Sequence, residues 1–377
     1  MFIGLSNHAA TVLKNGQVFV TGGNFNELFA YGMIYHPLIG SWDYTEGEMS
    51  IARFLHTSSL LLDGNVVVAG GIGISWYPEA LNITNLVDLY DTVDNKWVTT
   101  DNMHDARQSH TASVLSNGKV LVTGGETFNS VKLDTCELYD PLTGKWSRTS
   151  NMHYVRSGHT ATILQDGKVL IIGGTSNSTC ELYDPLTGNW TKIASMNVPR
   201  SYHTATLLMN DQVLVSGGLD NSNNSTSSCE LYDRSMNTWI IVGSMYQPRA
   251  FFTASLLPNG KVLVAGGTGN DNHNLLNSTE LYDPLTRSWT KAEDMLLSIS
   301  DHTASVLNNG NIFVTGGFEG VTQNPTNVSM LYYSSMIAFT SSDDIENLQA
   351  SREIFMVTNE KESPAVEDNL KTTNNKQ

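Results

Sequence analysis

The sequence is poor in cysteine, and its three cysteines cannot all pair with one another. Cys136, Cys180 and Cys229 occupy one slot of a repeated pattern, each three residues before a tyrosine. Equivalent slots in neighbouring sheets are expected to lie beyond the Cα separation of about 7 Å that a disulfide allows. Free thiols favour a reducing compartment, so the predicted location is the cytoplasm.

The asparagine residues favour the opposite location, outside the cell. Asn-x-Ser/Thr triplets are acceptors of N-linked sugar in secreted proteins, and they keep an extracellular location open. They stand at Asn82, Asn177, Asn189, Asn223, Asn224, Asn277 and Asn327. The N-terminal segment MFIGLSNHAATVL has no basic start, so the sequence predicts no signal peptide. No apolar run is long enough to predict a transmembrane helix.

Basic residues are also scarce: 21 Lys and Arg face 37 Asp and Glu, for a formal net charge of −16. The segment 341–377 carries eight acids and four bases, which leaves −12 on the residues before it. A body of this charge repels phosphate groups. Nucleic acid and an anionic membrane are therefore excluded as main partners.

A single pattern fills most of the chain and recurs seven times. A histidine is followed fourteen residues later by Gly-Gly, then by a tyrosine, and in six copies by a tryptophan seven residues after the tyrosine. Successive Gly-Gly pairs are 44 to 54 residues apart, which indicates an array of one small unit. Such units bury their faces against neighbours and form one cooperative body.

Residues 157–196 form a representative unit, and they predict four strands. Residues 159–164 alternate in polarity, Asp166-Gly167 is a hairpin signal, and residues 169–172 form a short apolar run. Residues 180–183 and 190–193 flank the turn sequence DPLTG. Four strands joined by short loops make a meander, and the constant spacing fixes its register.

The Gly-Gly pairs with spaced Tyr and Trp resemble the Kelch repeat over residues 5–335, and the HTA…DGKVL…GG sequence is similar to the galactose-oxidase-type Kelch subgroup. The resemblance implies an all-β, seven-bladed propeller with four antiparallel strands per blade. We expect the propeller to span 1–340 and an acidic disordered tail to span 341–377. The expected blades are 5–49, 53–103, 107–152, 156–196, 200–245, 249–295 and 299–340. The last blade lacks the Trp, so its fourth strand is expected at 335–339.

Arginine and acid appear together in blades 2 to 6 and are both missing from blades 1 and 7. Their joint presence predicts ion pairs between first and third strands, and the alternative is a ring of arginines that captures acidic ligands. The arginines are Arg53, Arg107, Arg156, Arg200 and Arg249, and the acids are Asp88, Glu137, Glu181, Glu230 and Glu280.

The repeated histidine is interpreted as a packing and hydrogen-bonding position, because Phe252 takes its place in blade 6. Seven equivalent positions around a ring cannot all bind one metal ion. The sequence therefore predicts no metal site, no cofactor and no catalytic residue.

The loops between second and third strands vary most, from 9 to 19 residues between the second Gly and the Tyr. They and the links between blades are expected on one face, and loops on a rigid scaffold commonly carry recognition. The candidate partner-binding rim consists of Trp76, Tyr77, Phe128, Phe251, His273, Arg107, Arg156 and Arg200. For Trp76, packing over its own loop is the alternative.

A rigid ring with diverse loops favours a monomeric, non-catalytic scaffold or adaptor that binds a protein or peptide. Kelch-type enzymes acting on sugars are the alternative: an oxidase would need copper ligands and a Tyr–Cys crosslink, and a mutarotase would need an acid or base at the channel mouth. An extracellular carbohydrate-binding propeller is a further alternative. Fold resemblance alone does not assign a ligand.

Overall fold

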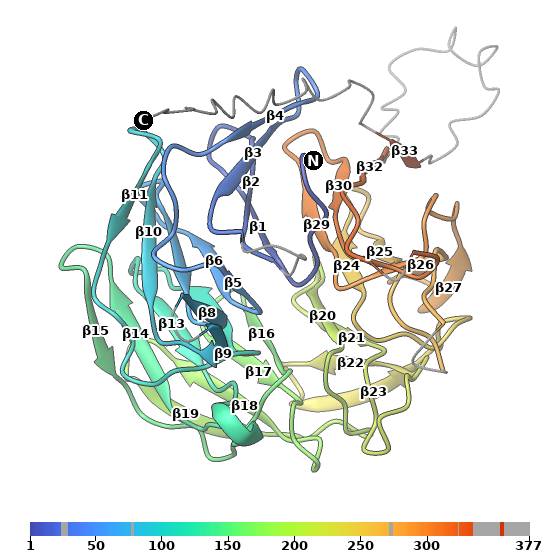
Figure 1. Ribbon diagram of the computed structural model, residues 1–377. Coiled ribbons are helices and arrows are strands. Elements are labelled where there is room, and N and C mark those ends of the chain that lie inside the picture. Colours follow the sequence, from blue (N-terminus) through green and yellow to red (C-terminus); the bar gives the residue numbers. More distant parts are fainter. Residues whose placement is uncertain (24–28, 77–78, 271–273, 323, 335–354, 358–377) are drawn as a thin grey trace, which may run out of the picture.

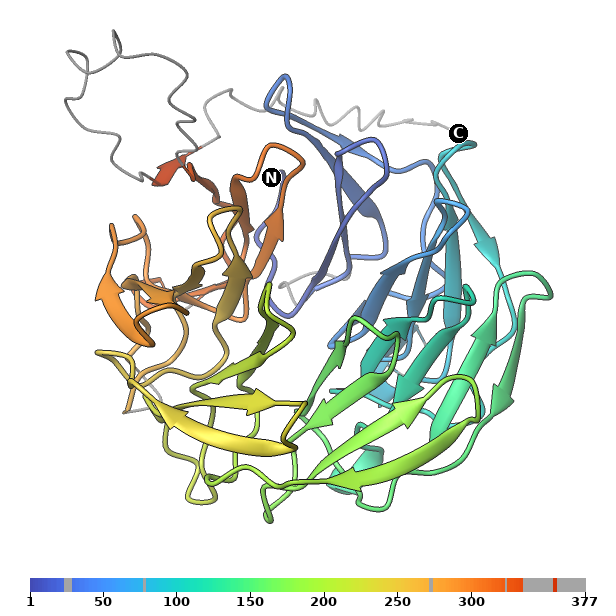
Figure 2. The ribbon, with the colours of Figure 1, turned by 180° about the vertical axis from the view of Figure 1, so that it is seen from behind.

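Seven antiparallel sheets follow one another around a central axis (Figures 1 and 2). This computed structural model describes residues 1–23, 29–76, 79–270, 274–322, 324–334 and 355–357. Each first strand lies beside the first strands of both neighbouring blades, and β1 (Ala9–Val12) lies beside β29 (Thr303–Val306), which closes the ring. The predicted all-β, seven-bladed propeller is confirmed.

Within each blade, the four strands pair in the order in which they follow along the chain. Blade 1 contains β1, β2 (Val18–Thr21), β3 (Gly32–His36) and β4 (Ser41–Tyr44). Blade 2 contains β6 (Thr57–Leu60), β7 (Val66–Ala69), β10 (Val87–Asp91) and β11 (Lys96–Thr99). Blade 3 contains β12 (Thr111–Val114), β13 (Val120–Thr123), β14 (Cys136–Asp140) and β15 (Lys145–Arg148). Blade 4 contains β16 (Thr160–Ile163), β17 (Val169–Ile172), β18 (Cys180–Asp184) and β19 (Asn189–Ile193).

Blade 5 contains β20 (Thr204–Leu207), β21 (Val213–Ser216), β22 (Cys229–Asp233) and β23 (Thr238–Val242). Blade 6 contains β24 (Thr253–Leu256), β25 (Val262–Ala265), β26 (Thr279–Asp283) and β27 (Ser288–Lys291). Blade 7 contains β29, β30 (Ile312–Thr315), β32 (Ser329–Tyr332) and β33 (Phe355–Val357).

The core lies between blades rather than inside them. Every second strand is buried on both faces, which is why these strands are continuous apolar runs. Val67 and Ala69 of blade 2, for example, belong to one cluster with Val120, Tyr139 and Trp146 of blade 3. Each sheet therefore depends on its neighbours for burial, as the repeat predicts.

The loops on one face carry small elements of their own. The long blade 2 loop folds into a hairpin of β8 (Ile72–Trp76) and β9 (Glu79–Ile83), and β8 also pairs with β5 (Arg53–Phe54). β28 (Ile299–Ser300) pairs with β31 (Phe318–Glu319). The blade 3 loop contains the 3-10 helix η1 (Phe128–Ser130).

The fourth strand of blade 7 differs from the prediction. Residues 335–339, where it was expected, lie outside the described residues, and β33 holds the fourth position by pairing with β32. Leu331 lies opposite Met356 in this pairing. The predicted disordered tail, 341–377, likewise lies outside the described residues except for β33.

Gly-Gly is required because the backbone of the next blade lies against it. A Cβ atom on Gly173 would lie 2.4 Å from the carbonyl oxygen of Arg200, and the N–H of Gly174 donates to the same oxygen at 2.9 Å. Both glycines also have positive φ, which other residues adopt only with strain. All seven junctions contain this bond at 2.7–2.9 Å, including the closing bond from Gly317 to Leu5.

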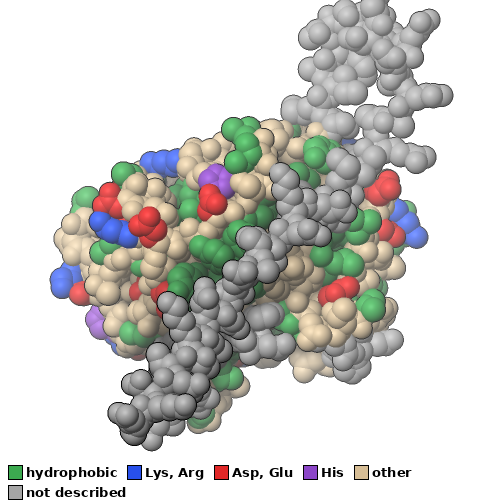
Figure 3. Space-filling model, turned by 45° about the horizontal axis from the view of Figure 1, so that its top comes forward, with side chains coloured by type: hydrophobic (Ala, Val, Ile, Leu, Met, Phe, Trp, Pro, Cys, Tyr) green, Lys and Arg blue, Asp and Glu red, His purple; other side chains and the backbone are tan. Residues whose placement is uncertain are grey.

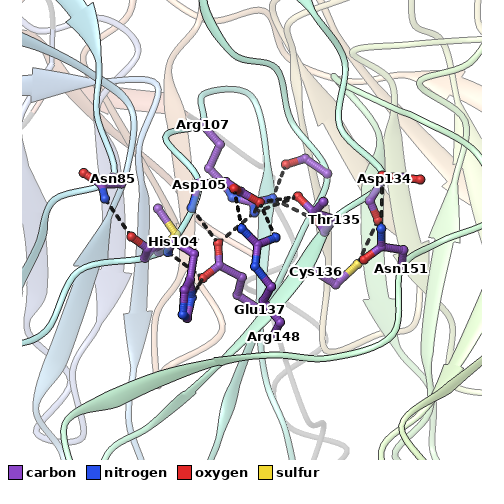
Figure 4. Close-up of polar contacts among 12 residues, drawn as sticks. Asn85, His104, Asp105, Arg107, Asp134, Thr135, Cys136, Glu137, Arg148 and Asn151 are labelled. Carbon is purple, nitrogen blue, oxygen red and sulfur yellow. Dashed lines mark hydrogen bonds and ion pairs between the residues drawn. The ribbon is translucent and has the colours of Figure 1, made fainter.

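Each of the five predicted arginine–acid pairs is brought together, and the arginine side chains are at most 1% exposed. Arg107 shows the arrangement (Figure 4): its Nη2 lies 2.9 Å from Glu137 Oε1, and its Nη1 donates to the Gly124 carbonyl at 2.7 Å. Glu137 also accepts the backbone N–H groups of His104 and Asp105, at 2.7 and 3.0 Å. The ion pair thus ties a link between blades to the end of the second strand.

Blades 1 and 7 fill the same positions with apolar side chains. Leu5 and Met33 are completely buried in one cluster, and Ile299 and Met330 lie together in another. Buried ion pairs can be replaced by apolar pairs at little net cost, whereas a lone charge there is strongly destabilising. This is why the acid and the base are lost together in these blades.

We expect Arg156→Ala and Glu181→Ala each to lower the free energy of unfolding by about 3–5 kcal/mol, because each leaves a buried charge without its partner. The double variant should cost less than the sum, since neither charge then remains. Urea denaturation of the four proteins gives these values. Lys145→Ala, which breaks an exposed pair with Asp101, is the control and should cost no more than about 1 kcal/mol. Additive effects at Arg156 and Glu181 would refute the coupling.

Candidate binding site at the channel mouth

The face that carries the second–third strand loops opens into a cavity of about 330 Å³ at the end of the central channel. We call this cavity the channel mouth. Every blade contributes the same two positions to it, the histidine slot and the residue before that slot. The lining residues are Asn7, His8, Leu55, His56, Ser109, His110, Gly158, His159, Tyr202, His203, Phe251, Phe252, Asp301 and His302.

The residue before the histidine slot has a left-handed backbone in all seven blades, with φ between 50° and 63°. Glycine adopts this conformation freely, and Asn and Asp tolerate it. For Leu55, Tyr202 and Phe251 it costs roughly 1–2 kcal/mol each. Backbone strain of this kind is concentrated at functional sites.

Hydrogen bonds connect these left-handed residues around the axis. At six of the seven junctions the N–H group donates to the carbonyl oxygen of the equivalent residue in the preceding blade, at 2.8–3.3 Å. The bond from Asn7 to Asp301, at 3.1 Å, joins blade 1 to blade 7. Backbone hydrogen bonds therefore also cross the closing junction of the ring.

The histidines bind the preceding blade. Nε2 of His203 lies 3.0 Å from the Thr160 hydroxyl, and His8 makes the same contact with Thr303 across the closing junction at 2.9 Å. Burial lowers the pKa of all six histidines, to about 4 for His8 and about 3 for His203. They are therefore neutral at pH 7 and act as cross-blade hydrogen-bonding groups.

Blade 6 departs from this arrangement. Phe252 takes the histidine position, and the buried hydroxyl of Thr204, which would face a histidine there, has no hydrogen-bond partner among the described residues. An unsatisfied buried hydroxyl costs about 1–3 kcal/mol. The repeat therefore loses stability at this point in favour of an aromatic ring at the mouth.

Three consecutive blades give the mouth an aromatic and acidic side. The rings of Tyr202 and Phe251 are in contact, with centroids 4.6 Å apart and planes tilted by 31°. A Cβ on Gly158 would lie 2.9 Å from the Tyr202 ring, so glycine makes room for it. Asp301 follows in the next blade, with the Ser300 hydroxyl donating to it at 2.7 Å. Burial raises the pKa of the Asp301 carboxyl.

The structure corrects three of the predicted rim residues. Arg107, Arg156 and Arg200 are at most 1% exposed, and their guanidinium groups are bound to acids and carbonyl groups of their own blades. They cannot reach a partner, which removes the alternative of an arginine ring for acidic ligands. Phe251 lines the channel mouth, and Phe128 is 65% exposed on η1.

Three other rim predictions stay untested. Tyr77 and His273 lie outside the described residues. For Trp76 the backbone alone is described, and it pairs with Glu79 in the β8–β9 hairpin.

Most of the mouth was not predicted from the sequence, because the residue before the histidine has no repeated chemistry. A signal was present: Asn7, Gly158 and Asp301 are residue types that tolerate positive φ, and they stand at one position of the repeat. That position is occupied by a different residue in every blade.

Comparisons with known families fit this geometry. The model of the KLHDC2/KLHL20/DRC7 Kelch-repeats domain matches residues 149–317, and that of the Kelch motif matches residues 109–153. This chain belongs to the Kelch-repeat family. No curated protein matches it significantly in sequence.

Two solved structures are similar to this Kelch chain in fold. A fungal alcohol oxidase of the AA5 family, solved in complex with copper, superposes with a TM-score of 0.69 at 20% identity over 85% of this chain and 73% of the oxidase chain. The structure of YjhT superposes with a TM-score of 0.60 at 19% identity over 78% of this chain and 99% of the other. At these identities the likeness shows the fold alone.

The donor set does not fit a copper centre of the kind that the oxidase comparison raises. Within the described residues, no three or more His, Cys, Asp or Glu side chains gather so as to hold a metal ion. The three cysteines are free and buried, and burial raises the pKa of Cys136 and Cys180 to about 12 and that of Cys229 to about 11.

Among the residues that the structure describes, no helix is both long and apolar enough to cross a membrane.

Stability should fall as the pH drops below 6.5. The histidines bind protons in the unfolded state near pH 6.5, but in the folded state only near pH 3–4, so unfolding takes up protons between these values. Each histidine then contributes about 1.4 kcal/mol per pH unit. His203→Phe, which copies the natural Phe252, should reduce the slope of unfolding free energy between pH 6 and 5 by about this amount. Equal slopes by urea denaturation would contradict it.

Relief of backbone strain should be measurable at Leu55. Leu55→Asn should raise the free energy of unfolding by about 1 kcal/mol, because Asn7 shows that asparagine takes the same φ of 54°. Leu62→Asn is the control: Leu62 is exposed in a turn without positive φ, so no gain is expected. Thermal and urea unfolding would measure both, and an equal change in the two variants would rule out strain as the cause.

Proposed function

We propose that this Kelch propeller is a non-catalytic binding module, a scaffold or adaptor, that holds a protein or peptide partner at the channel mouth and over the loops of the same face. The observation that carries the proposal is the ring of left-handed residues. Its backbone geometry is the same in every blade, whereas its side chains are Asn, Leu, Ser, Gly, Tyr, Phe and Asp.

A structural role does not account for that variety. The glycine and tyrosine positions keep their residue types in every blade, and the histidine position changes only once, to Phe252. The mouth position keeps its conformation and changes its chemistry, at an energetic cost where the residue is Leu, Tyr or Phe. Different side chains around one rigid rim are suited to recognising an asymmetric ligand.

The surrounding loops extend the proposed surface. The β8–β9 hairpin, which includes Trp76 and leads through Tyr77, and the exposed Phe128 belong to loops of this face. Exposed aromatic side chains commonly anchor protein interfaces. The opposite face carries short turns of nearly constant length.

An enzyme acting on sugars is the weaker proposal. The fold of the copper oxidase is shared, but the described residues do not supply its type of metal donor set. The one carboxylate at the mouth, Asp301, stands among neutral histidines, and a mutarotase-like role would need a proton donor or acceptor of matched pKa. We therefore favour binding over catalysis.

Peptide selection tests the proposal directly. Random peptides displayed on phage would be selected against the immobilised propeller, and selected sequences would be synthesised for affinity measurement by fluorescence anisotropy. Phe251→Asn should weaken binding about tenfold or more, because an aromatic anchor at the mouth is lost while the backbone φ is kept. Unfolding curves would show that the variant is folded.

The matched control is Leu186→Asn on the opposite face, where Leu186 is 96% exposed in a turn of blade 4. It should leave affinity unchanged. Failure to enrich any peptide, or equal loss of affinity in both variants, would count against the proposed function.

A further inference from the structure

We propose that the channel mouth takes the ammonium or guanidinium group of a lysine or arginine side chain from a peptide partner, held by the Asp301 carboxylate and the Tyr202–Phe251 aromatic pair. This inference rests on the proposed function and names the chemistry of its ligand.

Asp301 is set apart from the repeated acids by its lack of a cation. The repeated acids of blades 2 to 6 are each paired with a buried arginine. Asp301 is partly buried at the mouth, and no Lys, Arg or His of the described residues forms an ion pair with it. The Ser300 hydroxyl donates a hydrogen bond to its carboxylate. A partly buried carboxylate without a cationic partner gains most from a ligand that brings a positive charge.

The direction of its pKa agrees with this reading. Burial raises the pKa of Asp301 and the Ser300 hydrogen bond only partly opposes it, so the ionised form is under-stabilised without a ligand. A bound cation would supply the missing interaction.

Two aromatic rings line the same cavity as this carboxylate. The Asp301 N–H donates to the Phe251 carbonyl at 3.1 Å, and the Phe251 ring contacts the Tyr202 ring. Ring faces attract ammonium and guanidinium groups, by about 0.5–2 kcal/mol. A carboxylate with an adjacent aromatic pair therefore recognises both the charge and the apolar stem of a long basic side chain.

The remainder of the mouth does not oppose a cation. Its six histidines are neutral because burial lowers each pKa, and apart from Asp301 its other lining residues are uncharged. Asp301 is thus the single charged side chain among the lining residues. On the face shown in Figure 3, described acidic and basic side chains lie interspersed. The net charge of −16 favours the approach of a basic partner.

The size of the cavity fits one side chain rather than a whole segment. About 330 Å³ is at the lower end of the range for ligand pockets. A peptide would therefore lie over the loops of this face and insert a single long side chain along the axis.

The test compares four pools of random octapeptides whose variable positions are uncharged. Each pool has one fixed central residue, which is arginine, lysine, norleucine or glutamate. Binding to the full-length protein is measured by fluorescence anisotropy for the wild type, Asp301→Asn and Asp94→Asn. Asn is tolerated at the Asp301 position because Asn7 has the same φ. Asp94→Asn removes the same charge from an exposed turn of blade 2, so it controls for long-range electrostatics.

We expect the arginine and lysine pools to bind the wild type about tenfold or more tightly than the norleucine pool. That preference should be lost in Asp301→Asn and kept in Asp94→Asn. If all four pools bind the wild type equally and Phe251→Asn weakens their binding, the proposed recognition of a cation would be overturned. The proposed function as a peptide-binding module would still stand. Absence of binding by every pool would overturn both, and binding of methyl glucoside in a Phe251-dependent manner would replace the peptide by a sugar.

Discussion

The residue at the arginine position of each link is the one on which the rest of the ring depends, because it contacts two blades at once. The backbone carbonyl of Arg107 accepts the N–H of Gly71 from the preceding blade, and its guanidinium binds the Gly124 carbonyl and Glu137 within its own blade. Two and three residues later the chain places Ser109 and His110 at the channel mouth. The same group therefore fixes the junction between sheets and the position of the candidate site.

This link consists of a backbone hydrogen bond to glycine and a side-chain ion pair. The backbone hydrogen bond is present at all seven junctions. Leu5 and Ile299 have no charge, yet their carbonyl groups accept the same glycine N–H, at 2.7 and 2.8 Å. Only glycine leaves room for that carbonyl, whereas the side chains beyond it can be an ion pair or an apolar pair of similar volume. The ring thus closes between blades 7 and 1 by the same contact that joins the others.

Sequence predicted the parts of this protein that repeat. The seven units, the buried second strands and the pairing of Arg156 with Glu181 all follow from spacing and joint occurrence. Sequence could not show that Arg156 is inaccessible, because an arginine at a sheet end is equally compatible with a rim until its neighbours are placed. The fourth strand of blade 7 was missed for another reason: β33 lies far along the chain, and its short segment carries no Tyr–Trp signal.

Most of the channel mouth was missed because the feature that its residues share is conformational. Asn, Leu, Ser, Gly, Tyr, Phe and Asp have no common chemistry, and the structure is needed to show that all seven have positive φ. A strained backbone conformation persists only where neighbouring contacts hold it in place. Here the arginine link on one side and the histidine–threonine bond on the other side hold it. Because that support is supplied by repeated residues, the side chains at the mouth are free to differ. In blade 6 the histidine itself is replaced. Phe252 cannot make the histidine–threonine bond, so the Thr204 hydroxyl has no hydrogen-bond partner among the described residues. The ring is therefore less stable at the point where the mouth has an additional aromatic ring.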